Sequence, residues 1–398
     1  MNPFARLLVL AGRGEPYRIL FPLGGAISVI GVMLWPLFVA GWLPFYPGPA
    51  HARIMVEGFV FSFVAGFLAS ALPHMLEVKG ICLWQTLLMA GMILSATLMH
   101  LAGLSVWGDA LFALAVPVLL AMVLRRWPER KDLPPPGFAL AAVGLVAGWI
   151  GALLLILSAW AGLPPFALGL AKLLLHHGFI LFPVLGVGAY LLPRMVGVPN
   201  RHLIAPKSSA VSPAWIRRAC FMLGCGLLLV VSFALEAAGY VRYGYIVRAV
   251  VAMGCLLHEV PLHRARRFRG SIPRALTLSI IFILTGLGVI AVFPLRQMTY
   301  LHVVFISGYG LLILNISARV MLGHSGCEPL IYARSAAPRW ITGLILLAMA
   351  TRVSADLLPK MQLTHYAYAA ITWVVVIVLW LIVYGPLLME SPAQQEST

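Results

Sequence analysis

The stretch Tyr300–Gly326 reads YLHVVFISGYGLLILNISARVMLGHSG, and its composition decides the class of fold. It contains about twenty apolar residues in a row, which is enough for one helix to cross the hydrocarbon core of a bilayer. His302 opens the run, and Arg319 and His324 stand near its end. Ionisable side chains at such places are costly in lipid and usually serve a function. The stretch therefore predicts a membrane-spanning helix with a functional histidine at its start.

The rest of the chain has the same character. Of its 398 residues, 62% are hydrophobic and only 10% are charged, which excludes a soluble globular protein. A window of about twenty residues finds about twelve apolar runs. They cover roughly residues 19–41, 51–73, 81–103, 105–124, 138–162, 166–193, 214–239, 243–262, 273–294, 299–322, 338–358 and 363–388. We expect an all-α integral membrane protein with about twelve transmembrane helices in one bundle.

The basic residues predict the orientation of this bundle. The net charge of +16 fits cytoplasmic loops rich in arginine and lysine, so we expect no nucleic-acid partner. If the N-terminus is cytoplasmic, the basic residues gather in the inner loops, around 125–131, 194–218 and 264–274. The outer turns hold little beyond Arg242, Arg296 and Lys360. This asymmetry predicts that both termini lie in the cytoplasm.

Nothing in the sequence divides the chain. We find no internal repeat and no long linker, which indicates one membrane domain over residues 1–398. A short cytoplasmic segment, 1–18, would precede it, and a frayed polar tail, 390–398, would end it. The cysteines lie mostly in apolar runs and indicate no disulfide framework. They are Cys82, Cys220, Cys225, Cys255 and Cys327.

Several histidines fall in the outer half of the predicted bundle. His51, His100, His302 and His365 stand at the outer ends of spans. A neutral imidazole is a good ligand for haem iron and for copper. A single histidine at a span end is more often an interfacial anchor, which is the plainer interpretation of His100 and His365. For His51 and His302, anchor and metal ligand both remain open.

The adjacent pair His176-His177 lies deeper, about 15 Å below the outer surface at the rise of a helix. Two imidazoles at that depth each need a polar partner or a metal, because bare burial costs several kcal/mol. Metal ligation and a hydrogen-bonded structural role both remain open. Adjacent side chains point about 100° apart on a helix, so the pair would share one metal only with distortion.

Other side chains near the outer face complete a candidate haem site. Met55 follows His51 by one turn on the same face. Three arginines, Arg53, Arg296 and Arg352, lie near the outer face and could meet haem propionates.

Two acidic residues within spans have different interpretations. Glu57, about two turns into its span, is a candidate catalytic group that passes protons or orients a histidine. Asp356 follows Arg352 by four residues, which predicts a structural ion pair.

Short motifs along the chain resemble those of one family, NnrS, whose members are bacterial membrane haem–copper proteins linked to nitric oxide. The residues that carry the resemblance are Tyr17–Gly24, His51–Met55, Gly58-Phe59, Gly66–Leu68, Ala71–Pro73, Gly178-Phe179, Leu191–Arg194, His302, Arg319, Leu322–Gly326 and Arg352. The family pattern has a second histidine and a glutamate where this chain has Arg53 and Ile54. The likeness covers most of the chain and identifies it as a divergent member.

The resemblance implies a protein of the bacterial cytoplasmic (inner) membrane that binds haem, b-type first, with copper as a second metal. His51 and His302 would be the axial ligands or the closest candidates. His176, His177 and His100 would be further metal candidates. Nitric oxide or another small gas would bind, and an enzyme acting on nitric oxide would also need an electron donor. Because this chain has Arg53 and Ile54 in place of the family's histidine and glutamate, copper binding remains open.

A weaker likeness in architecture connects the chain to the haem–copper oxidases, which also place histidines on the second, sixth and tenth of about twelve spans. Two other functions remain open. One is a secondary transporter that uses the membrane ionisable groups and carries no cofactor. The other is an accessory factor that handles haem or copper for another enzyme. The expected partners are therefore membrane lipid, nitric oxide or another small gas, and an electron donor if the protein is an enzyme.

Overall fold

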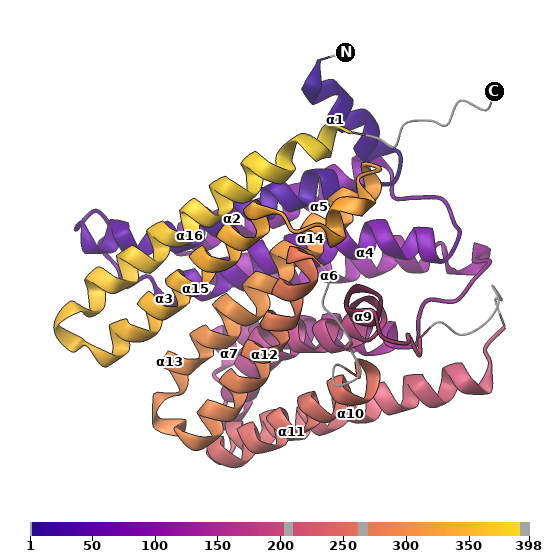
Figure 1. Cartoon of the computed structure of the whole chain (residues 1–398). Helices are drawn as coiled ribbons and strands as arrows, with labels where there is room; N and C mark the ends of the chain where they lie inside the picture. Colours follow the sequence, from indigo (N-terminus) through magenta and orange to yellow (C-terminus); the bar gives the residue numbers. More distant parts are fainter. Residues whose placement is uncertain (1, 203–209, 262–269, 391–398) are drawn as a thin grey trace, which may run out of the picture.

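The computed structural model describes residues 2–202, 210–261 and 270–390 (Figure 1). Within these ranges every regular element is a helix and none is a strand. Eleven helices or continuous helical runs are long and apolar enough to cross a bilayer. The prediction of an all-α, multi-pass membrane protein is therefore confirmed.

The exact number of crossings stays a prediction. The eighth predicted span, 243–262, corresponds to α11 (Val241–Glu259), which is not among the eleven. However, α1 (Pro3–Gly12) packs against η9 (Gly385–Met389), so both ends of the described chain lie at one end of the bundle (Figure 1). If α11 also crosses, the number of crossings is even, as two ends on one side would require.

The side that faces the cytoplasm stays a prediction. Part of the basic loop on which it rests, residues 264–269, lies outside the described residues. The same holds for Lys207 and for residues 391–398 of the predicted frayed tail.

The helices form three groups of four, and the second helix of each group is interrupted. The first group is α2 (Tyr17–Val39), the run α3 (Gly48–Arg53)–η1 (Ile54–Val60)–α4 (Phe61–Met75), α5 (Leu83–Leu101) and α6 (Ser105–Leu124). The second is α7 (Phe138–Ala161), the run α8 (Pro165–Leu173)–η3 (Leu174–Gly178)–α9 (Phe179–Val196), α10 (Pro213–Ala237) and α11. The third is α12 (Ser271–Val292), the run α13 (Gln297–His302)–η6 (Val303–Gly310)–α14 (Leu311–His324), α15 (Ala336–Leu357) and α16 (Gln362–Tyr384).

The three groups pack in the same way. In each group the first helix lies against the interrupted helix, and the third lies against the fourth. The fourth helix then packs on the first helix of the next group: α6 on α7, α11 on α12, and α16 back on α2. The bundle therefore closes into a ring with threefold internal similarity. The sequence carries only a trace of this similarity: Gly58-Phe59 and Pro73 recur at unchanged spacing as Gly178-Phe179 and Pro193.

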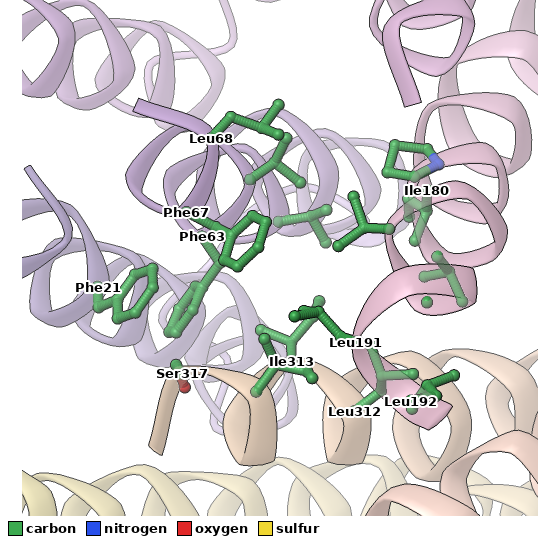
Figure 2. Close-up of a pocket in the computed structure, with 17 residues that line it drawn as sticks. Phe21, Phe63, Phe67, Leu68, Ile180, Leu191, Leu192, Leu312, Ile313 and Ser317 are labelled. Carbon is green, nitrogen blue, oxygen red and sulfur yellow. The ribbon is translucent and has the colours of Figure 1, made fainter. Parts of the chain in front are cut away.

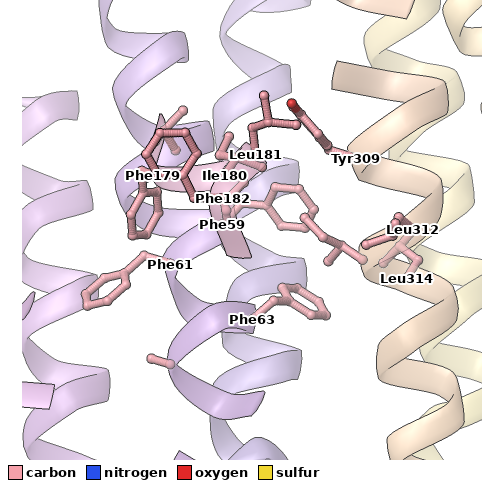
Figure 3. Close-up of a cluster of buried hydrophobic side chains, with 14 of the residues drawn as sticks. Phe59, Phe61, Phe63, Phe179, Ile180, Leu181, Phe182, Tyr309, Leu312 and Leu314 are labelled. Atoms are coloured by element: carbon pink, nitrogen blue, oxygen red, sulfur yellow. The ribbon is translucent and has the colours of Figure 1, made fainter. Parts of the chain in front are cut away.

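The interrupted helices form the centre of the ring. The buried share of the apolar window is 78% in Gly48–Met75, 83% in Pro165–Val196 and 61% in Pro294–His324. In the other eight spans it is 50% or less, which marks these three as the inner helices. Aromatic side chains fill the space between them (Figure 3). For example, Phe61 meets Phe179 edge-on, with ring centroids 6.0 Å apart.

Each inner helix contains a π-helical segment, namely η1, η3 and η6. A π segment widens one turn of a helix and is found frequently at functional sites. One glycine of each segment, Gly58, Gly178 or Gly308, faces the first helix of its own group. A Cβ atom on Gly58 would lie 2.6 Å from Ile27, and one on Gly308 would lie 2.6 Å from Ile283. Only glycine allows the inner helix to approach this closely.

Alanine at these glycines is expected to destabilise the protein to different degrees. Gly58→Ala and Gly308→Ala would each push a β-branched side chain aside and should cost about 1–3 kcal/mol. Gly178→Ala should cost less, because its Cβ atom would stand 3.3 Å from the nearest atoms. Thermal unfolding in detergent measures the order, and Gly91→Ala, where a Cβ atom meets nothing within 4 Å, is the control. Equal losses at all three glycines would contradict this ranking.

An apolar cavity of about 90 Å³ lies between the C-terminal halves of the inner helices (Figure 2). Phe63, Ile180 and Ile313 each approach it from a different inner helix (Figure 2). The one polar side chain among its described lining residues is Ser317, whose hydroxyl donates to the Leu314 carbonyl at 2.9 Å. Such a lining suits a small uncharged molecule and disfavours an ion.

Arg18 joins the two ends of the chain. Its buried guanidinium donates to the carbonyl oxygens of Leu387 at 3.2 Å and Leu388 at 2.6 Å, and it pairs with Glu15. The Glu15 carboxylate also accepts a hydrogen bond from Nδ1 of His324, at 3.0 Å. These contacts tie α2, α14 and η9 together at one end of the bundle.

Acid is expected to weaken this junction. Partial burial raises the pKa of the Glu15 carboxyl, but the hydrogen bonds from His324 and Arg18 outweigh burial and hold that pKa below 4.5. A carboxyl whose pKa is lower in the folded than in the unfolded protein stabilises the fold at pH values above its unfolded pKa. This stabilisation is lost as the pH falls through the pKa of the folded state. The difference in thermal stability between wild type and Glu15→Gln should therefore shrink below about pH 4.5. If the difference in thermal stability stays constant down to about pH 3, the ionised Glu15 carboxylate does not stabilise the junction.

Candidate metal centre

Every inner helix carries a histidine at its π segment. His51 lies in α3 shortly before η1, His176 and His177 lie within η3, and His302 is the last residue of α13, directly before η6. His51 and His302 stand seven and six residues before Gly58 and Gly308, whereas His176 stands two residues before Gly178, so His176 lies about one turn further along its inner helix. The predicted ligands thus lie on three separate helices, each in or near a π segment.

The rings of His51 and His302 are held in the same way. Nδ1 of His51 lies 3.0 Å from the carbonyl oxygen of Gly31, and Nδ1 of His302 lies 2.7 Å from that of Met298. A carbonyl oxygen only accepts, so in both rings Nδ1 carries the hydrogen. The lone pair of each neutral imidazole is then on Nε2, where a metal could bind it. Both side chains are half-buried.

The two neighbouring histidines of η3 have different surroundings. His176 bonds to the backbone of Lys172, and its Nε2 is buried without a hydrogen-bond partner among the described residues. His177 instead packs between Phe233 and Phe305, with ring centroids 6.3 Å and 5.6 Å away. Its Nδ1 also lacks a partner among the described residues. The two rings therefore serve separate environments, and His176 repeats the arrangement of His51 and His302.

His51 and His302 lie close to each other and to one arginine. His302 interacts electrostatically with His51, and both interact with Arg352. The His51 ring also meets Trp35 edge-on, with centroids 6.0 Å apart. The structure thus brings together two predicted ligands and one predicted propionate anchor.

Arg352 is held by an acidic and aromatic cluster. It pairs with Asp356 at 2.9 Å, which confirms the predicted ion pair, and it lies 4.2 Å above the ring of Tyr366. The Tyr366 hydroxyl donates to Asp356 at 2.6 Å. Arg296, which is exposed, reaches the backbone oxygen of Asp356 at 3.5 Å. Both arginines therefore stand at the end of the bundle that holds His51 and His302.

A second cluster lies beside the first inner helix. Nε2 of His100 and Oε2 of Glu57 are 3.0 Å apart, and Arg53 binds Asp109 through two hydrogen bonds of 2.7 and 3.3 Å. Potential ligand atoms of Glu57, His100 and Asp109 all lie within 4.8 Å of one another. All three residues are buried, and His100 is only 1% exposed. The interpretation of His100 as an interfacial anchor was therefore wrong.

The charges in this cluster favour a proton over a metal cation. The Arg53 guanidinium already compensates one of two carboxylates, and it would repel a divalent ion bound beside Asp109. Glu57 and His100 share the remaining site, and Oε1 of Glu57 and Nδ1 of His100 have no partner among the described residues. This pair can hold one proton on either side chain.

Comparison with known proteins gives a family for this arrangement. The family model described as NnrS protein matches residues 13–391, nearly the whole chain. The chain belongs to the NnrS family. As a member it is, broadly, a nitric-oxide-related membrane protein. No curated protein matches the chain.

The structure shows what occupies the two positions where this NnrS-family chain departs from the expected motif. Arg53 extends to Asp109 of α6, so the departure is part of a buried ion pair. Ile54 and Met55 pack against Gly31 of α2, whose carbonyl binds His51. Met55 therefore supports the backbone behind His51.

Three residues of the NnrS-family site were not predicted. Asp109 could have been found, because an acidic residue one turn into an apolar span indicates function. Trp35 and Tyr366 carried no such signal, because aromatic residues near span ends are common in the membrane interface.

Proposed function

We propose that this NnrS-family protein binds haem at the His51–His302 end of its inner helices and binds nitric oxide there, in the bacterial inner membrane. One observation carries the proposal: His51, His302 and His176 each use one ring nitrogen for the backbone, and among the described residues no hydrogen bond engages Nε2 of any of the three. Metal-binding histidines typically have such a hydrogen bond on the other nitrogen, because it sets the tautomer and the ring orientation.

The residues present fit a haem group with a second nitrogen-ligand site. His51 and His302 interact electrostatically, and either would serve as an axial ligand to the iron, while Arg352 and Arg296 would meet the propionates. His176, whose buried Nε2 has no partner among the described residues, would take a copper ion or face the open side of the haem. When bound, haem would supply an iron position at which a small gas can bind.

Two further features support a gas as ligand. The apolar cavity between the inner helices would admit an uncharged diatomic molecule and exclude ions. The Glu57–His100 pair can hold a proton beside the inner helix that carries His51, because Glu57 lies on that helix and His100 lies on the neighbouring α5. If the protein turns nitric oxide over, Glu57 and His100 would deliver protons, and an electron donor would have to bind as a partner.

The test is a reduced-minus-oxidised absorption spectrum of the detergent-purified protein, with metal analysis of the same sample. We expect about one haem per chain and a shift of the spectrum when nitric oxide is added. A colourless, metal-free protein that gains no spectrum from added haem would refute the proposal.

A further inference from the structure

Three sulfur atoms meet between α10 and α11, on helices that carry none of the π-segment histidines. Sγ of Cys255 donates a hydrogen bond to Sδ of Met222 at 3.8 Å. Cys225 lies one turn after Met222 on the same face of α10, and its thiol contacts the thiol of Cys255. Met222 and Cys255 are 0% and 2% exposed, and Cys225 is 8% exposed.

The spacing of these atoms matches a three-coordinate metal. Thiolate sulfur binds such ions at about 2.3 Å. Three sulfur atoms around one ion in a plane would then lie about 4 Å from each other. The separation of 3.8 Å between Cys255 and Met222 is close to that value, so a metal needs little movement of either helix.

We propose that Met222, Cys225 and Cys255 form a binding site for a soft monovalent cation, Cu⁺. Thiolate and thioether ligands together select Cu(I), whereas Zn²⁺ prefers four ligands and hard cations prefer oxygen. Binding replaces the two S–H bonds with two S–Cu bonds, copper stays Cu⁺, and two protons leave. No electron is transferred, so no oxidant or reductant is required.

Polar groups at the end of α11 give the site a connection to the surface. Glu259 follows Cys255 by one turn, and its carboxylate contacts His202 at 2.8 Å and Arg218 at 3.0 Å. It also contacts His258 at 2.8 Å, whose side chain is 47% exposed. The exposed His258 imidazole is thus placed as a first contact for the arriving ion and as a group that can pass the released protons to water.

The site is independent of the proposed haem site. It uses none of the histidines at the π segments, and its sulfur ligands differ from their nitrogen ligands. Binding is therefore tested in a His51→Ala/His176→Ala/His302→Ala background, so that failure of the haem proposal leaves this test intact.

The experiment titrates Cu⁺ into this protein under reducing, anaerobic conditions against a colorimetric Cu⁺ chelator. We expect one tightly bound Cu⁺ per chain, with sulfur as its neighbour in X-ray absorption. Cys225→Ala and Cys255→Ala should each lower the affinity at least about tenfold. Cys220→Ala, which changes an exposed cysteine of the same helix, is the matched control and should bind like the parent.

A conservative variant separates ligation from folding. Met222→Leu keeps the volume of the side chain and should reduce the sulfur neighbours of copper from three to two while the thermal stability changes little. Unchanged copper affinity in both cysteine variants, or only nitrogen neighbours in the parent, would overturn the proposal. Loss of binding in Cys220→Ala as strong as in Cys255→Ala would also overturn it.

Discussion

His302→Ala is expected to yield a protein that has lost most of its haem. The imidazole is held by its bond to the Met298 carbonyl and lies near His51, so alanine removes the ligand and leaves the remaining partners in place. The haem content per chain, measured from the reduced-minus-oxidised spectrum, should fall about tenfold or more. His51→Ala should behave in the same way.

Two controls make this result specific. His74→Ala removes an exposed histidine in the last turn of α4 and should leave the spectrum unchanged. Imidazole added to His302→Ala should restore part of the haem, because it can occupy the space of the missing ring. A His302→Ala protein with full haem content and an unchanged spectrum would show that His302 is no ligand.

Arg53→Met is expected to cause a large loss of stability. It leaves the Asp109 carboxylate buried without its cation, since the Asp109 side chain is only 2% exposed. Removing one partner of a buried ion pair typically costs about 3–5 kcal/mol. Thermal or denaturant unfolding in detergent measures the loss, with Arg242→Met, at an exposed arginine, as the control.

The double variant Arg53→Met/Asp109→Leu decides the cause of that loss. Replacing both charges with apolar side chains of similar size is often neutral or stabilising. We therefore expect the double variant to recover most of the stability that Arg53→Met loses. If it is as unstable as the single variant, Arg53 acts through packing and its charge contributes little.

Much of the architecture could be predicted from the sequence, because most spanning helices correspond to a run of apolar residues long enough to cross a bilayer. The predicted span 299–322 lies within the run Pro294–His324, and the predicted span 166–193 lies within Pro165–Val196. The predicted span 243–262 corresponds to the helix α11, which holds Arg248 buried in its middle. The interruptions were not predicted, since a π segment changes the local turn without changing the hydropathy.

Several residues of the candidate site were singled out one by one from the sequence, but the contacts between them were not predicted. Hydropathy places Glu57 and His100 at certain depths, but it says nothing about which helices are neighbours. Their contact at 3.0 Å depends on α5 packing against η1, and that is a property of the whole ring. The internal similarity did leave a trace in the sequence, in the repeated spacing of Gly58 and Gly178 to a later proline, but short motifs of common residues are easily passed over.

The closure of the ring, in which α16 packs on α2, also sets an order of events during synthesis. The indole nitrogen of Trp373 in α16 donates to the hydroxyl of Ser28 in α2 at 3.1 Å. The first spanning helix to leave the ribosome, α2, therefore cannot form its contact with α16 until the last spanning helix has been synthesised. Until translation ends, the face of α2 that carries Ser28 lacks its permanent neighbour and is open to lipid, to the insertion machinery and to proteases. A chain that stops short of α16 leaves that face permanently uncovered.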